Sequence, residues 1–328
     1  MIRSEMRFVV LALLASIVAA TAPPQAGAQS NAKIARVGVL SPFVGPDSMF
    51  FEVLRHRLSE LGYVEGRNIA FVYRTAEDFD QLLTHARDMV RLNVDVIATA
   101  GPQGVRAAKT ATSTIPIVMG NVGDAVSQGF VAGLARPGGN VTGISSLNTE
   151  LSAKRLALLK EAFPKITRVA VLREAVGEAA PLRASEATAR SLGISLEVFQ
   201  VRDADELPSA FSAMTAARLG GLQLLPGAMF VSQLRRIVEL TAAARLPAIY
   251  ADDRFVRAGG LMSYGSSVTE LYARAAEYID RILKGAKAGE LPVEQPTTFT
   301  LAVNLKTARD QGLTIPSSFL ARADQVLR

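Results

Sequence analysis

Short apolar runs alternate with longer amphipathic stretches along most of the chain. The apolar runs are rich in Val and Ile, which favours β-strands, and the stretches between them have helical spacing. The first part of the pattern predicts strands at residues 36–40, 68–74, 94–100 and 115–120 and helices at 49–61, 78–92 and 104–111. Strands that alternate with helices form βαβ units. The sequence therefore predicts a parallel sheet with helices on both faces.

The same order of elements then occurs a second time. RVAVL at 168–172 repeats RVGVL at 36–40, and GGLMSYGSS at 259–267 repeats GGNVTGISS at 138–146. The offset stays between 121 and 132 residues, which predicts a duplicated α/β domain. The alternative is that any two α/β domains share such strands and glycine turns by composition. We interpret the two glycine pairs as turns that precede a strand.

After the second copy come a helix at 268–283, a Gly- and Pro-rich stretch, a strand at 298–304 and a helical segment near 305–311. Such extra elements are expected to cross between the two copies and form a hinge, which would let two lobes close on a ligand. The predicted boundaries are 32–146 plus 265–299 for lobe one and 147–264 plus 300–328 for lobe two.

Residues 1–28 have the pattern of a secretory signal peptide. Arg3 and Arg7 precede an apolar run from Phe8 to Ala20, and small residues end at Ala28, where we expect cleavage. A membrane anchor is the alternative, but a spanning helix needs about 20 apolar residues. Because the chain has no cysteine, we expect no lipid anchor, and we expect the mature protein to be periplasmic and not inserted in the membrane.

Composition removes several classes of chemistry. The chain has 328 residues, no cysteine and two histidines, which excludes disulfides, thiol nucleophiles and Cys-ligated metals. The G-x-S-x-G, phosphate-loop and dinucleotide motifs are absent from the sequence. The 36 basic and 30 acidic residues are interspersed, unlike a nucleic-acid footprint. We therefore expect no enzyme, no cofactor, no metal site and no nucleic-acid partner, and we interpret His56 and His85 as partly solvated.

Open parallel sheets bind ligands beyond the carboxyl ends of their strands, so the loops after the strands hold the candidate site. Backbone N–H groups near Pro42, Gly101 and Pro102 are suited to an anionic group such as a carboxylate. Asp124, Asp252 and Asp253 are candidates to accept hydrogen bonds from an ammonium group, while Phe43, Phe230 and Tyr264 are candidate apolar walls. Ser41, Gln103 and Ala228 complete the candidate ligand-binding residues. Helix capping is the alternative role for Ser41, Asp124 and Asp252.

Several longer segments resemble one protein family. RVGVLSPF, LARPGGNVTG, KRLALLKEAFP, GGLMSYG and LKGAKAGELPVEQPTTF are similar to the tryptophan-binding-like branch of ABC-transporter substrate-binding proteins, and the likeness covers nearly all of the mature chain. The resemblance implies a type 1 periplasmic-binding-protein fold with two Rossmann-like lobes and three hinge crossovers. It also implies a small ligand clamped in the cleft and delivered to an inner-membrane ABC permease, and we expect a monomer. The family's common form differs at Pro102, Ala125 and Arg173-Glu174.

The sequence thus leads to one main hypothesis and two alternatives. The main one is a periplasmic binding component of an ABC importer for an amino acid or an aromatic or branched carboxylate. The first alternative is a sensing module that presents its closed form to a membrane receptor. The second is an exported hydrolase or isomerase that uses Asp124 and Asp252 as an acid–base pair.

Overall fold

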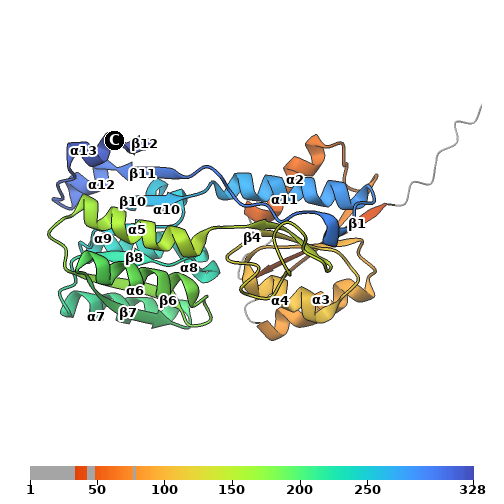
Figure 1. The fold of residues 1–328 in the computed structure, drawn as a ribbon, viewed down its shortest axis with the longest axis horizontal. Helices are drawn as coiled ribbons and strands as arrows, with labels where there is room; N and C mark the ends of the chain where they lie inside the picture. Colours follow the sequence, from red (N-terminus) through yellow and green to blue (C-terminus); the bar gives the residue numbers. More distant parts are fainter. Residues whose placement is uncertain (1–33, 43–48, 77–78) are drawn as a thin grey trace, which may run out of the picture. The chain divides into compact units, whose positions relative to one another are not determined.

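Two β-sheets organise the chain, and each is covered by helices (Figure 1). The computed structural model describes residues 34–42, 49–76 and 79–328. Both sheets lie in one compact unit from Ala35 to Arg328. The predicted signal peptide at 1–28 and the candidate residue Phe43 lie outside the described residues.

The first sheet has five parallel strands in the order β2-β1-β3-β4-β5. They are β1 (Ala35–Pro42), β2 (Ile69–Ala76), β3 (Val96–Thr99), β4 (Ile117–Val122) and β5 (Val141–Ser145). β3 and β5 are buried at every position, as expected for strands covered on both faces. We call this sheet with its helices the first lobe.

Two helices cover each face of the first sheet. Figure 1 shows α3 (Phe79–Arg91) and α4 (Gly101–Ala111) on one side and α2 (Met49–Glu60) and α11 (Val268–Leu283) on the other. The side chains of α2 and α11 share one apolar core with alternate residues of β1, such as Val37. Although α11 is more than 200 residues from α2 in the sequence, its apolar face is therefore buried in the first lobe.

The second sheet has seven strands in the order β12-β11-β10-β9-β8-β6-β7. They are β6 (Arg168–Glu174), β7 (Ser195–Val201), β8 (Leu222–Leu224), β9 (Ala248–Tyr250), β10 (Met262–Gly265), β11 (Thr300–Asn304) and β12 (Gln325–Leu327). The strands from β6 to β10 repeat the order of β1 to β5, which confirms that one domain plan occurs twice. β11 is antiparallel to β10, a departure from the predicted all-parallel sheets, because the chain returns to this sheet from the first lobe.

The second sheet is also covered on both faces, and we call it with its helices the second lobe. One face packs against α5 (Asn148–Ala162), α6 (Ala180–Leu192) and α13 (Ser317–Leu320). The other packs against α7 (Leu207–Ala216), α8 (Ala228–Ser232), α9 (Leu234–Ala243) and α10 (Asp253–Arg257). The remaining helix α12 (Leu305–Asp310) and the short 3₁₀ turns η2 (Ala204–Glu206) and η3 (Ala288–Glu290) lie in the connections.

The chain crosses between the lobes three times: between β5 and α5, between β10 and α11, and between the segment at 284–296 and β11. The third crossing is attached to the first lobe by backbone hydrogen bonds. The N–H of Glu294 donates to the Gly143 carbonyl at 3.0 Å, and the N–H of Ser145 donates to the Glu294 carbonyl at 2.8 Å. The segment that leads into the third crossing therefore runs along the outer edge of β5.

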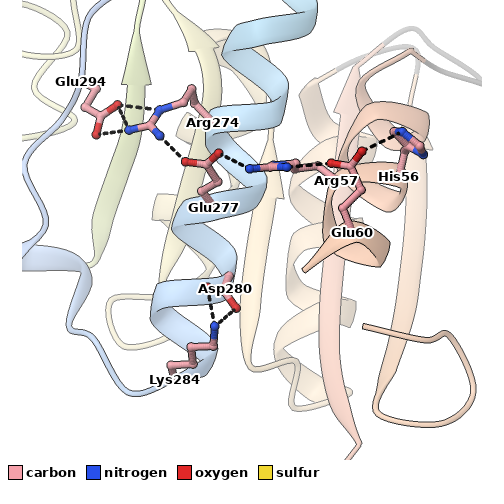
Figure 2. A network of polar contacts seen from close by, with 8 residues as sticks. All are labelled: His56, Arg57, Glu60, Arg274, Glu277, Asp280, Lys284 and Glu294. Carbon is pink, nitrogen blue, oxygen red and sulfur yellow. Dashed lines mark hydrogen bonds and ion pairs between the residues drawn. The ribbon is translucent and has the colours of Figure 1, made fainter. Parts of the chain in front are cut away.

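A chain of ion pairs links α2, α11 and the third crossing (Figure 2). Arg57 on α2 donates to Glu277 on α11 at 2.9 Å, and Arg274 donates to both Glu277 and Glu294. These side chains are at least a quarter exposed, so each pair contributes little to stability. The apolar core beneath them is the main reason that α11 lies here.

Candidate functional site

A cavity of about 190 Å³ lies beyond the carboxyl ends of strands from both lobes. The first lobe contributes the ends of β1 and β4 and the start of α4. The second lobe contributes the segments that follow β6, β8 and β9, and the first two crossings add Ser146 and Ser266. A concave site that several convergent loops line is the form expected of a small-molecule site.

Most of the candidate residues from the sequence are brought together in this wall. The eight that line the cavity are Ser41, Pro42, Gly101, Pro102, Gln103, Ala228, Phe230 and Asp252. They come from the carboxyl ends of four strands, β1 and β3 in the first lobe and β8 and β9 in the second.

Three candidates lie elsewhere. Asp124 is exposed, and its carboxylate accepts the N–H groups of Val126 at 3.2 Å and Ser127 at 3.0 Å, which is the capping role weighed above. Asp253 accepts from Arg257 on the same short helix. Tyr264 packs its ring 6.1 Å from that of Phe299, measured between centroids.

The start of α4 forms the first-lobe wall. Gly101 has a positive φ of 78°, and Pro102 occupies the first turn, where a missing N–H has no cost. Within the described part of the chain, no side chain caps this end of the helix. Its free N–H groups give the wall a partial positive charge.

A buried basic cluster occupies the part of the wall next to the first two crossings. The Arg155 side chain, from the interior of α5, is only 1% exposed. Asp252 caps α10 by accepting the N–H of Arg254 at 2.9 Å, and its carboxylate also accepts from the Arg254 guanidinium at 2.8 Å. Asp252 is therefore both the cap of α10 and the ion-pair partner of Arg254, and its carboxylate is occupied by protein groups.

Two carboxyl groups occupy the wall after β6. Glu174 is 4% exposed, and its Oε1 accepts the N–H groups of Met229 at 2.7 Å and Phe230 at 3.3 Å. The Glu178 carboxyl group lies against the backbone of Gly123 from the first lobe. Burial raises the pKa of both carboxyl groups.

Beside these acids, Arg173 donates to the Gly177 carbonyl at 2.7 Å, and its buried Nε has no acceptor among the described residues. The cavity wall therefore offers a ligand both carboxyl groups, which accept hydrogen bonds, and a guanidinium group, which donates them.

Aromatic side chains supply the apolar part of the wall. Phe50 and Tyr272 meet edge to face with ring centroids 4.7 Å apart, and Phe230 lies on the side of the second lobe. Burial raises the pKa of Tyr272 to about 12, so its hydroxyl is neutral at physiological pH. Next to it, the buried Oδ1 of Asn121 has no protein donor among the described residues.

The residues that the sequence did not single out are mostly charged. Glu178 lies in one of the loops that were predicted to face the ligand, but the sequence of a loop does not show whether an acidic side chain in it is buried. Arg155 has a clearer signal. It continues the stripe of Leu151, Leu158 and Leu159 along the buried face of α5, where a charged residue is unexpected unless it is functional or paired.

Among the described stretches of chain, we find no helix with the length and hydrophobicity to cross a bilayer. In the same stretches, no three acidic or histidine side chains gather closely enough to hold a metal ion.

Comparisons with known proteins agree on one family. The family model described as ABC transporter substrate binding protein matches residues 37–327. A tyrosine-binding protein of Clostridioides difficile is 25% identical over 256 residues, which cover 77% of this chain and 73% of that protein. Members of this family bind solutes and are not enzymes.

Solved structures give the same result. An ABC domain from Streptococcus pneumonia in complex with L-Trp has a TM-score of 0.81 and 26% identity, and the match covers 89% of this chain and 99% of that one. A conserved domain protein from Vibrio cholerae has a TM-score of 0.82 and 29% identity, with 90% and 100% coverage. The type 1 periplasmic-binding-protein fold is thus confirmed.

Proposed function

Because this chain belongs to the family of ABC transporter substrate-binding proteins, we propose that it is the solute-binding component of an ABC importer and holds an amino-acid-like ligand between its two lobes. The observation that carries this proposal is the cavity whose wall is built from both lobes and from two of the crossings between them. A ligand in such a place contacts both lobes at once, so binding favours the closed arrangement.

The chemistry of the wall supports an amino acid with an aromatic side chain. The wall offers a guanidinium and the start of α4 for a carboxylate, carboxyl groups for an ammonium, and the rings of Phe50, Phe230 and Tyr272 for an apolar group. The structure of the similar protein from Streptococcus pneumonia was solved with L-Trp, and the relative from Clostridioides difficile is named a tyrosine-binding protein. We therefore place L-tryptophan and L-tyrosine first among the ligands to test.

We further propose that the protein acts in the periplasm as a monomer and delivers its ligand to an inner-membrane permease. The signal-like pattern of residues 1–28 supports the location. For the lobe boundaries we propose 32–146 with 265–299 and 147–264 with 300–328, because three crossings of the chain fall near these limits.

The proposal is tested by thermal unfolding of the purified protein with each of the 20 L-amino acids and, as a contrasting class, with polyols and sugars. A ligand at 100 times its Kd adds about 2.7 kcal/mol to the stability of the native state, which raises Tm by a few degrees in a chain of this size. We expect such a shift with aromatic amino acids. A shift with polyols alone would contradict the proposed ligand class.

A pair of variants shows whether the cavity is the place of binding. Ala228 is partly exposed and lines the cavity, so Ala228→Phe should fill the space and abolish the ligand-induced shift while the lobe stays folded. Ala258 is exposed at the end of α10, and Ala258→Phe should keep the full shift. An unchanged shift in Ala228→Phe would place the ligand elsewhere.

A further inference from the structure

Arg155 is a buried charge on the wall of a cavity. Its side chain is 1% exposed, yet it is part of the cavity lining. Burial lowers the pKa of Arg155 to about 9, so the guanidinium remains charged at neutral pH. A buried charge without a counter-ion is costly, and this one has a space beside it that a ligand can fill.

The hydrogen bonds of Arg155 leave two of its donors unused. A guanidinium has five N–H groups. Nε donates to the Tyr264 carbonyl at 2.7 Å, Nη2 donates to Asn148 Oδ1 at 3.1 Å, and Nη1 makes a longer bond of 3.4 Å to Ser152 Oγ. All three acceptors are neutral. Two N–H groups, one on each Nη atom, therefore have no acceptor among the described residues.

The carboxylate that acts on Arg155 already pairs with another cation. Asp252 favours the charged form of Arg155 electrostatically, but both of its oxygens accept from Arg254. Two guanidinium groups thus share one carboxylate. This part of the wall has an excess of one positive charge, which favours an anion and opposes the ammonium group that the sequence placed beside Asp252.

The contacts of Arg155 also hold it in place. Asn148 is the first residue of α5, directly after the first crossing, and Tyr264 lies in β10, just before the second. The guanidinium is thus fixed by the ends of two hinge segments. A group that is held in position before binding loses little freedom when it pairs with a ligand.

We propose that Arg155 binds a carboxylate group of the ligand and so restricts the site to small carboxylates. This inference rests on the proposed function and assigns the charge selection to one side chain. Planar guanidinium and carboxylate groups form short, charge-assisted hydrogen bonds. The start of α4 is the competing place for the carboxylate, but it offers partial charges only.

The first test changes the ligand and leaves the protein native. Isothermal titration calorimetry compares L-tryptophan with L-tryptophanamide, and L-tyrosine with L-tyrosinamide, at neutral pH. Each amide keeps the ring and the amine and loses only the negative charge. Loss of one partner of a buried charge pair predicts at least about 30-fold weaker binding of the amide. Equal binding of acid and amide would overturn the inference and leave the proposed function intact.

The second test changes the protein. In Arg155→Gln the preference for the acid should fall to within about threefold, and in Arg155→Lys part of it should survive because the charge is kept. Arg183→Gln removes a positive charge from an exposed position on α6, the neighbouring helix of the same lobe, and should keep the full preference. Circular dichroism and thermal unfolding report whether each variant folds.

The outcomes separate the inference from the function on which it rests. Loss of preference in Arg155→Gln alone supports the inference. A preference that survives in a folded Arg155→Gln places the carboxylate elsewhere, for example at the start of α4, and overturns it. If Arg155→Gln does not fold, Arg155→Lys and the acid-to-amide ratio of the native protein decide. If none of the four compounds binds, the proposed ligand class fails and the inference falls with it.

Discussion

Gly123 is the position at which a single added methyl group should disrupt a contact between the two lobes. It follows β4 in the first lobe and lies against the Glu178 carboxyl group of the second lobe. A Cβ atom at Gly123 would lie 2.6 Å from Oε1 and 2.7 Å from Cδ of Glu178, and closer still to Oε2. The backbone of Gly123 does not have the positive φ that disfavours alanine. Gly123→Ala should therefore leave the first lobe folded and displace Glu178.

The size of the effect follows from the contact that is lost. The Glu178 carboxyl group lies against the Gly123 backbone, which favours its charged form, and a polar contact with a charged group contributes about 1.5–3 kcal/mol. If this contact forms when the lobes close, its loss weakens ligand binding by about 10- to 150-fold. The stability of the ligand-free protein should change by less, because the contact joins two lobes that each have their own core.

The assay is calorimetric titration with the amino acid that gives the largest thermal shift. Gly139→Ala is the matched control, since a Cβ at Gly139 meets no atom of the described residues within 4 Å. Glu178→Ala removes the obstruction as well as the contact, so Gly123→Ala should have no further effect in that background. Ligand binding by Gly123→Ala within threefold of the native protein would show that the contact does not contribute. An effect that persists with Glu178→Ala would also contradict the prediction, because the methyl group would then obstruct the ligand itself.

Three further predictions concern stability. Gly143 has a φ of 124°, and a Cβ there would lie 2.7 Å from the backbone N of Met119, so Gly143→Ala should destabilise the protein by about 2–4 kcal/mol in urea unfolding; an unchanged midpoint would contradict this. Burial raises the pKa of Glu174 above its ordinary 4.5, so its contribution to stability is full below pH 4.5 and is lost as the pH rises through the raised value. Glu174→Gln should flatten that decline in a series of Tm measurements, and parallel curves would speak against it. Arg57→Ala should lower Tm only slightly and lose its effect in high salt, whereas a large, salt-independent loss would contradict this.

Much of the fold is predictable because it depends on local periodicity. After their first arginine, RVGVL at 36–40 and RVAVL at 168–172 are continuous apolar runs, as expected of strands that are buried on both faces. The shared strand order follows from the repeat. The last strand, Gln325–Leu327, was not predicted, because three residues with a largely exposed pattern give no periodic signal. β11 is antiparallel because of the direction in which the chain returns from the first lobe. The local hydrophobic pattern of a strand does not show this direction.

The sequence predicts where the site lies better than it predicts the chemistry of the site. The rule that ligands lie beyond the carboxyl ends of parallel strands led to Ser41, Gly101 and Asp252, which do line the cavity. The rule does not tell which partner a charged side chain has. Asp252 looks like an acceptor for a ligand ammonium in the sequence, but the structure pairs it with Arg254. Arg155 lies in a helix interior, outside the loops that the rule selects.

A crystal structure of the protein grown with L-tryptophan would show directly whether the ligand lies in the cavity and contacts both lobes. The predicted result is a ligand between the start of α4 and the segment that follows β8, with its carboxylate about 3 Å from the Arg155 guanidinium. A ligand bound outside the cavity, or held by one lobe alone, would contradict the account.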